Sequence, residues 1–232
     1  VSFLPGGPVI WSPDPVNMPD VEDEYTTHID GVQSMCMGDV YYYGLGVSQN
    51  KTKAKQFYRL GADAGDAYCL GVCHLLGIGC QKRQKKAFGL FKCAADQGHC
   101  GAQGRLGYMY KHGEGAPKDL KEAFRLFKCA AGQGNAMAQN NLGYMYKHGE
   151  GVPKDSKEAF RLYHLAADQG NARAQNNLGY MYEYGKGVSK DLKEAFRLYQ
   201  LAADQGNARA QNNLGYMYEH GKWVPKDSKE AF

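Results

Sequence analysis

The chain has 232 residues, and because 43% of them are hydrophobic it can bury a sizeable core. Its 28 basic and 24 acidic residues give a net charge of +4. The two signs are mixed, without the basic run that binds phosphate backbones, so nucleic acid is not an expected partner. No apolar stretch reaches the roughly 18 residues that cross a bilayer, so we expect no membrane span. No signal peptide opens the printed sequence, but it starts at Val1 rather than Met, which leaves the compartment open, secretion included.

Residues 1–30 do not share the pattern of the rest of the chain. They contain five of the eight prolines and an acidic cluster at 20–24. This composition is typical of extended or disordered segments. The first eleven residues, VSFLPGGPVIW, are nevertheless apolar enough to dock in a groove of this chain or of a neighbouring copy. We therefore expect a proline-rich, acidic N-terminal arm over 1–30, followed by a second region over 31–232.

From residue 31 onward the sequence repeats, mostly with a period of 36, which is the signature of a repeat architecture. The pair Leu-Gly recurs at 70–71, 106–107, 142–143, 178–179 and 214–215. The block QNNLGYMY stands verbatim in the last three copies. The Gly-x-Gly at 44–46 stands three residues closer to the one at 77–79 than this period requires. We place the missing residues in 64–71, at a turn between repeats, where a deletion is cheapest. The expected units are 31–65, 66–98, 99–134, 135–170, 171–206 and an incomplete 207–232.

Each unit is predicted to contain two helices, as residues 171–206 illustrate. Asn171 is the expected N-cap of the first helix, and Gly185 ends it, because glycine accepts the left-handed conformation. Asp191 caps the second helix, and Glu194 completes a capping box. The two apolar stripes are Ala174, Leu178, Met181 and Tyr182 in the first helix, and Ala195, Leu198, Tyr199 and Ala202 in the second. Since one short helix cannot bury such a stripe alone, stacked copies should form an all-α solenoid of about five and a half units.

The second unit is expected to be the least stable of the full units. Arg83 stands where later units have the capping aspartate, and Gly89 lies inside the second helix. Each change costs about 1 kcal/mol of helix stability.

The repeated residues resemble the Sel1-like repeat pattern, A-x-x-x-L-G-x-x-Y-x-x-G-x-G-V-x-x-D-x-x-x-A-x-x-x-Y-x-x-A-A-x-x-G. One copy is carried by Ala174, Leu178, Gly179, Tyr182, Gly185, Gly187, Val188, Asp191, Ala195, Tyr199, Ala202, Ala203 and Gly206. The resemblance covers roughly 31–232, and Trp223, in place of a turn glycine, departs from it. It implies a right-handed α/α superhelical solenoid related to tetratricopeptide arrays, acting as an adaptor in assembly, degradation, secretion or host–microbe contact. A cysteine-rich subgroup has regular cysteine pairs that are absent here, so its β-lactam binding is not implied.

No group of residues forms a recognisable catalytic or metal-binding pattern. Structural zinc sites use tighter, paired spacings than the run Cys69-x3-Cys73-His74-x5-Cys80. The glycine-rich turns lack the following Lys-Ser/Thr of a phosphate loop. Histidines recur between the two helices of several units, but Tyr184 fills the same place in the fifth. We therefore expect no metal, no cofactor and no enzymatic activity.

The seven cysteines are interpreted mainly as packing residues. Cys93 and Cys129 align with Leu165 and Leu201 of later units, which predicts buried thiols acting as small hydrophobes. A disulfide between Cys93 and Cys100 is conceivable if the protein is extracellular.

The first helix of each late unit carries polar residues opposite its apolar stripe. Asparagine both donates and accepts hydrogen bonds, and tyrosine offers a flat apolar body with a polar tip. On a concave surface such a ladder could hold an extended peptide by its backbone, or a glycan by ring stacking. The other interpretation is that these are ordinary exposed or inter-helix residues kept by recent duplication. Asn177 lies nearer the core, and its side chain is expected to satisfy buried backbone groups. The candidate binding residues are Asn140, Tyr144, Arg173, Asn176, Tyr180, Arg209, Asn212 and Tyr216.

The sequence favours an interaction scaffold that binds a protein partner on the concave face of the first helices. The last repeat stops at Phe232 with an uncovered apolar face, and either the protein continues beyond this residue or another subunit covers the face. Coverage by another subunit gives the alternative function, a structural protomer. Copies could then join head to tail into a filament, with the N-terminal arm as a strap. Asn50 lies in the only N-glycosylation sequon, and it is either a glycan acceptor, if the protein is secreted, or simply a helix cap.

Overall fold

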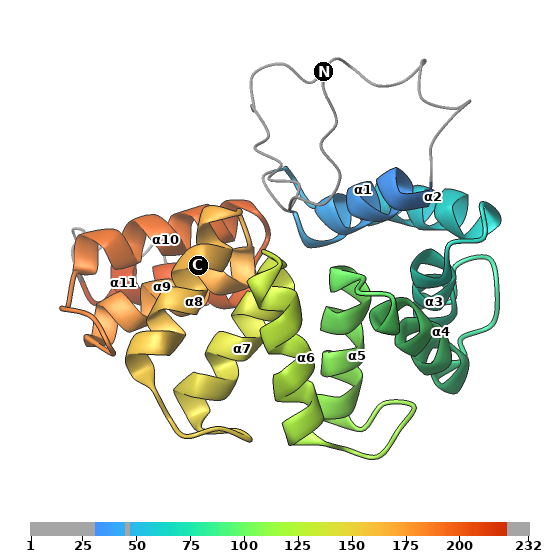
Figure 1. Cartoon of the computed structure of the whole chain (residues 1–232). Helices are drawn as coiled ribbons and strands as arrows, with labels where there is room; N and C mark the ends of the chain where they lie inside the picture. The colour runs from blue at the N-terminus through green and yellow to red at the C-terminus, as the bar shows by residue number, and fades with distance from the viewer. Residues whose placement is uncertain (1–30, 45–46, 222–232) are drawn as a thin grey trace, which may run out of the picture.

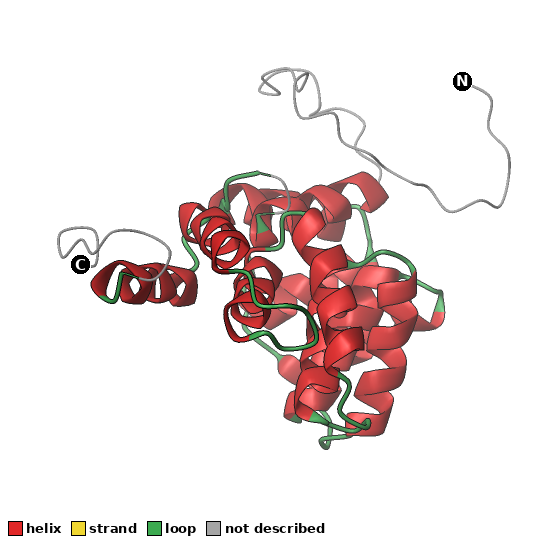
Figure 2. Ribbon diagram, turned by 90° about the vertical axis from the view of Figure 1, so that its left-hand side faces the viewer, coloured by secondary structure: helices red, strands yellow, loops and turns green. Residues whose placement is uncertain are grey.

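The computed structural model describes residues 31–44 and 47–221, and every regular element in them is an α-helix (Figure 2). None of these helices is long and apolar enough to cross a membrane. The N-terminal arm, Trp223 and Phe232 lie outside the described residues. The helices are α1 (Gly31–Tyr43), α2 (Lys51–Asp63), α3 (Ala67–Leu76), α4 (Gln84–Asp96), α5 (Cys100–His112), α6 (Leu120–Gly132), α7 (Ala136–His148), α8 (Ser156–Asp168), α9 (Ala172–Tyr184), α10 (Leu192–Asp204) and α11 (Ala208–Glu219).

The helices stack into a solenoid, as the period of the sequence predicts. Each helix packs against the next one in the chain, and each odd-numbered helix from α1 to α9 forms a unit with the even-numbered helix that follows. The units follow an arc that begins with α1 and α2 and ends with α9, α10 and α11 (Figure 1). Some odd-numbered helices also contact each other directly, α5 with α7 and α1 with α3. The surface that the odd-numbered helices share is called the first-helix face below.

The local signals at the helix ends are confirmed. The side chain of Asn171 accepts the N–H of Ala174 at 3.0 Å, which satisfies one of the free donors at the start of α9. Gly185 ends the same helix with φ +63°, in the left-handed region that glycine tolerates.

The predicted capping boxes form only in part. Asp191 accepts the N–H of Glu194 at 3.0 Å, but the Glu194 carboxylate turns to Arg197, at 2.6 and 2.9 Å. The N–H of Asp191 instead donates to the carbonyl of Tyr182 at 3.0 Å. The second half of the box is absent because a carbonyl of the preceding helix already binds the N–H that the glutamate would have accepted. Units 3 and 4 show the same arrangement.

Small residues set the distance between the two helices of a unit. A Cβ on Gly179 would lie 2.9 Å from the Tyr199 ring and 3.3 Å from the Ala195 carbonyl oxygen. Both Tyr199 and Ala195 are fully buried, so neither side can yield without opening the core. The glycine after the leucine is therefore a packing requirement in α3, α5, α7 and α9.

The three-residue deletion shortens a helix rather than a turn, so its predicted place in a turn was wrong. The turn 64–66 before α3 is as long as the turn 97–99 before α5, whereas α3 has 10 residues and α5 has 13. Three residues are close to one turn of helix, so α3 keeps an inward stripe that includes Tyr68 and Val72, exposed by 1% and 0%.

The helix α4 has both weaknesses that the sequence indicates. Arg83 stands at its N-cap and makes no side-chain hydrogen bond to the helix. Gly89 is exposed, and no atom lies within 4 Å of the place where a Cβ would be. Neither the loss of the capping aspartate nor the glycine is offset by better packing. The low stability of this unit therefore stays a prediction, with these two features as its causes.

The prediction that Cys93 and Cys129 are buried was wrong, because both side chains are exposed. The alignment with Leu165 and Leu201 holds, but these leucines are themselves 39% and 38% exposed. The position lies at the edge of the apolar stripe of the second helix rather than inside it. Cys93 and Cys100, considered above as a disulfide pair, are free thiols in this structure.

Candidate functional site

The polar residues of the block QNNLGYMY link successive units to one another. Asn177 of α9 donates to the side-chain oxygen of Asn140 in α7 at 3.0 Å. Asn213 of α11 donates to Asn176 in α9 at 2.9 Å. The prediction that Asn177 satisfies buried backbone was therefore wrong, since its amide pairs with an amide of the preceding unit. This ladder gives a structural reason for the two asparagines to recur.

Beside the ladder, the first-helix face contains a pocket of about 290 Å³ between α7, α9 and α11. Its lining consists of two cationic residues, four amides and one tyrosine, with no carboxylate. Asn176 uses its side-chain oxygen in the ladder, but no described residue accepts a hydrogen bond from its side-chain nitrogen, and Asn212 has no partner among them. Hydrogen-bond donors thus remain available to a ligand. The lining residues are Lys147, Asn176, Asn177, Tyr180, Arg209, Asn212 and Asn213.

The two cations of the pocket are close enough to affect each other. The amine of Lys147 lies over the ring of Tyr180, 4.1 Å from its centroid, in a cation–π contact. Burial, and then the positive charge of Arg209, lowers the pKa of Lys147. Both effects disfavour the charged lysine, and no carboxylate of the described residues forms an ion pair with it.

The equivalent lysine of the preceding unit has a counter-ion. The amine of Lys111 also lies over a tyrosine, 3.8 Å from the centroid of Tyr144, but it pairs with Glu150 at 3.1 Å. One unit later the residue aligned with Glu150 is Lys186. The exchange of one glutamate for a lysine therefore removes the carboxylate that would have neutralised Lys147.

The pocket brings together half of the predicted binding residues. It includes Asn176, Tyr180, Arg209 and Asn212. The other four do not line it: Asn140 is buried in the ladder, Tyr144 lies under Lys111, and Arg173 and Tyr216 are exposed elsewhere on the helices.

Sequence reasoning missed Lys147, Asn177 and Asn213 as members of the site. Lys147 lies at the end of α7, one turn beyond the positions on which the prediction relied. The signal for it was the reversal of charge between neighbouring units, where Glu183 replaces Lys147 and Lys186 replaces Glu150.

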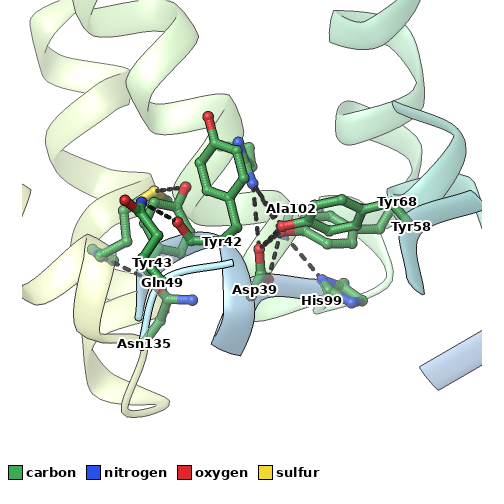
Figure 3. A network of polar contacts seen from close by, with 12 residues as sticks. Asp39, Tyr42, Tyr43, Gln49, Tyr58, Tyr68, His99, Ala102 and Asn135 are labelled. Atoms are coloured by element: carbon green, nitrogen blue, oxygen red, sulfur yellow. Dashed lines mark hydrogen bonds and ion pairs between the residues drawn. The ribbon is translucent and has the colours of Figure 1, made fainter. Parts of the chain in front are cut away.

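A second polar cluster lies at the start of the solenoid, and it is fully satisfied (Figure 3). The Asp39 carboxylate of α1 accepts hydrogen bonds from Tyr58 and Tyr68, at 2.6 Å each, and pairs with Arg105 of α5 at 3.3 Å. The Arg105 and Asp39 side chains are only 7% and 18% exposed. Burial, reinforced by the Asp39 charge, raises the pKa of both tyrosines, so their hydroxyls stay protonated and donate.

The end of α1 also reaches later units. The Tyr43 hydroxyl donates to the sulfur of Met137 in α7 at 3.0 Å, and the guanidinium of Arg105 lies 5.4 Å from the Tyr43 ring centroid. A Cβ on Gly44 would lie 3.3 Å from the side-chain oxygen of Gln205, in the turn after α10. The hydrogen bond of Tyr43 and the contacts of Asp39 with Tyr68 and Arg105 hold α1 to later units, so we assign no ligand to this cluster. The sequence signal for it is Arg105, which stands where three later units have asparagine.

The remaining candidate positions have structural roles. Among the described residues, no three His, Cys, Asp or Glu side chains lie close enough to hold a metal ion. In the cysteine-rich run, Cys80 Sγ lies 3.3 Å from His74 Nδ1, and no further ligand joins them. The side chain of Asn50 accepts the N–H groups of Thr52 and Lys53, at 3.1 and 2.9 Å. Its role as a helix cap is confirmed, whereas glycosylation there stays a prediction.

Solved structures share this arrangement of helices. A Sel1 repeat protein from Oxalobacter formigenes is 30% identical with a TM-score of 0.68, over 87% of this chain and 82% of that chain. The protective antigen c5321 of uropathogenic Escherichia coli, which displays an SLR fold, is 32% identical with a TM-score of 0.61, over 87% of this chain and 44% of that chain. The chain thus spans less than half of that antigen. The immunity protein PA5088 from Pseudomonas aeruginosa, 19% identical with a TM-score of 0.54 over 87% of this chain and 78% of that chain, shares the fold alone.

The repeats themselves match a family model. A comparison with curated proteins finds no match. The Sel1 repeat model matches residues 37–66, 67–99, 101–135, 136–171, 172–207 and 208–232. Sel1 repeat proteins are generally protein-interaction scaffolds. Because the six matches cover most of the sequence, the chain belongs to the Sel1 repeat family.

Proposed function

We propose that the chain is a non-catalytic interaction scaffold that binds an extended peptide segment of a partner over α7, α9 and α11. The observation that supports this proposal is the pocket of about 290 Å³, in which the side-chain nitrogen of Asn176 and the amide of Asn212 remain available. An extended peptide presents backbone N–H and C=O groups, which side-chain amides can pair in both directions. The odd-numbered helices bring these amides from successive units to one surface, so their spacing follows the repeat.

The same pocket favours a peptide over a glycan. Stacking of a sugar needs a free aromatic face, but the amine of Lys147 already covers Tyr180, and the Tyr184 ring centroid lies 4.6 Å from that of Tyr180. What the pocket offers is polar and amide-rich, which suits the hydrogen bonds of a peptide backbone.

The proposal is tested by selecting peptides from a random display library against the wild-type chain. The selected peptides should bind Tyr180→Ala and Asn212→Ala at least about tenfold more weakly, because both side chains line the pocket. The matched control is Tyr144→Ala, which removes the same side chain from the equivalent place one unit earlier, outside the pocket. Asn176→Ala is a poor probe, since it also deprives Asn213 of its acceptor.

Melting temperatures of the variants show whether a loss of binding is local. Selected peptides that bind Tyr180→Ala as tightly as the wild type would place the interaction elsewhere and refute the assignment of this face. The alternative of head-to-tail assembly rests on residues 1–30 and 222–232, which lie outside the described residues, and it stays a prediction. Light scattering of the full chain and of a chain without residues 1–30 would test it.

A further inference from the structure

The pocket between α7, α9 and α11 carries positive charge that its own lining does not balance. Lys147 and Arg209 both line it, and the pKa of Lys147 falls because of burial and then of the Arg209 charge. Placing a second cation beside a half-buried lysine costs free energy in the free protein. A bound anion would recover that cost.

A second pocket of the same chain shows that this imbalance is not general. The pocket of about 240 Å³ between α4, α5 and α6 also contains two cations, Lys92 and Arg125, but it contains Asp96 and Glu122 as well. Arg125 pairs with Glu122 at 2.6 Å. Lys111, the equivalent of Lys147 in α5, is likewise paired with Glu150. The repeat thus has its own means of neutralising these cations, and the pocket of α7, α9 and α11 lacks it.

We propose that this pocket binds a carboxylate of the peptide partner, a specialisation that rests on the peptide-binding function proposed above. The guanidinium of Arg209 can pair with both oxygens of a carboxylate, and the amine of Lys147 adds a second charge. The side-chain nitrogens of Asn176 and Asn212 donate to whichever oxygen remains. The carboxylate comes either from an aspartate or glutamate side chain or from the C-terminus of the partner, and the experiment below separates the two sources.

Three synthetic nonapeptides test the proposal, each titrated into isotope-labelled full chain and followed by NMR. They share a Gly/Ser sequence around one central tyrosine and have an acetylated N-terminus. The first has one glutamate and an amidated C-terminus, the second has no acidic residue and a free C-terminal carboxylate, and the third has neither. We expect at least one of the first two to shift the amide signals around Lys147 and Arg209, and the third to shift them much less. Which of the two binds identifies the source of the carboxylate.

Charge variants then locate the contact. Lys147→Met and Arg209→Gln should each weaken the carboxylate peptide about tenfold, the effect of losing one charge-assisted hydrogen bond. Lys186→Glu should weaken it similarly, because it restores the carboxylate that Glu150 provides in the preceding unit. The matched controls, Lys111→Gln and Arg173→Gln, change the equivalent residues outside the pocket and should stay within about twofold of the wild type.

Three results would overturn the proposal. If the neutral, amidated peptide bound the pocket as tightly as the others, carboxylate recognition would be refuted. The proposed peptide-binding function would not be affected. A second such result would be that none of the three peptides shifts the signals of the pocket. It would refute carboxylate binding, while the library selection would still decide whether the chain binds peptides. Arg173→Gln could also weaken binding as much as Arg209→Gln, which would mean general electrostatic attraction instead of a site.

Discussion

A single histidine performs a task in unit 3 that asparagine performs in the later units. The Nδ1 atom of His99 accepts the N–H of Ala102 at 3.0 Å and so caps α5, which only an unprotonated nitrogen can do. Asn135 and Asn171 occupy the equivalent place before α7 and α9. Burial lowers the pKa of His99 below 6.5. The folded chain therefore favours the neutral imidazole more than the unfolded chain does.

This difference in pKa predicts that protonation of His99 alone causes part of the loss of stability in acid. The contribution of His99 is fully present above its unfolded pKa of about 6.5, and it is lost as pH falls from there through the lower folded pKa. In His99→Asn the cap no longer titrates, so the free energy of unfolding should fall less between pH 8 and pH 5. Urea unfolding at several pH values measures this.

Comparing the wild type with His99→Asn removes the contributions of the other histidines. The pKa values of His112 and His148 are also lowered by burial, but both residues are present in the two proteins and their effects cancel. Parallel pH profiles for the wild type and His99→Asn would show that the cap is not the group responsible.

At the scale of the helix, the sequence was informative wherever a feature depends on local chemistry. The N-cap of α9 and its terminal glycine follow from residues a few positions apart, so Asn171 and Gly185 were predictable. The partner of the Glu194 carboxylate was not predictable from such local residues. It depends on the Tyr182 carbonyl of the preceding helix, which accepts the N–H of Asp191 in place of Glu194. The exposure of Cys129 was missed for a related reason, since an apolar neighbour in an alignment does not show how wide the buried stripe is.

The helix α4 gives the clearest prediction at this scale. Arg83→Asp should add the cap that aspartate provides to α6, α8 and α10, and Gly89→Ala should remove a flexible residue without a clash. Each change should stabilise the chain by about 1 kcal/mol. The free energy of unfolding measures the gain. In the wild type, amides of α4 should exchange faster than those of α8 or α10, and both substitutions should slow this exchange.

The control is another helical glycine of the same unit. A Cβ on Gly71 would lie 2.7 Å from the ring of Phe91, so Gly71→Ala should destabilise the chain although the residue change is identical. Exchange in wild-type α4 as slow as in α10 would contradict the weakness assigned to this unit.

For the whole molecule, periodicity predicted the stacking of units but not the contacts between distant ones. Each unit meets the same neighbours, so a pattern of 36 residues is enough to indicate the solenoid and the residues that face its core. The pairing of Asp39 with Arg105 joins α1 to α5 across an intervening unit. The pocket similarly depends on three helices from three units, and only four of its seven lining residues were predicted. Contacts of this kind arise from the curvature of the arc, which no local pattern specifies.

The ion pair between α1 and α5 predicts how firmly the start of the solenoid is held. Arg105→Met should lower the free energy of unfolding by about 3 kcal/mol, because it leaves the Asp39 charge largely buried. Amide exchange in α1 should accelerate more than exchange in α9, since Tyr43 and Asp39 both contact later units from α1. The double variant Asp39→Asn with Arg105→Met leaves neither charge unpaired, so its loss should be smaller than the sum of the single losses. Strictly additive losses, or an α1 that exchanges at the wild-type rate in Arg105→Met, would mean that this ion pair does not hold the first unit in place and that the other contacts of α1 do so.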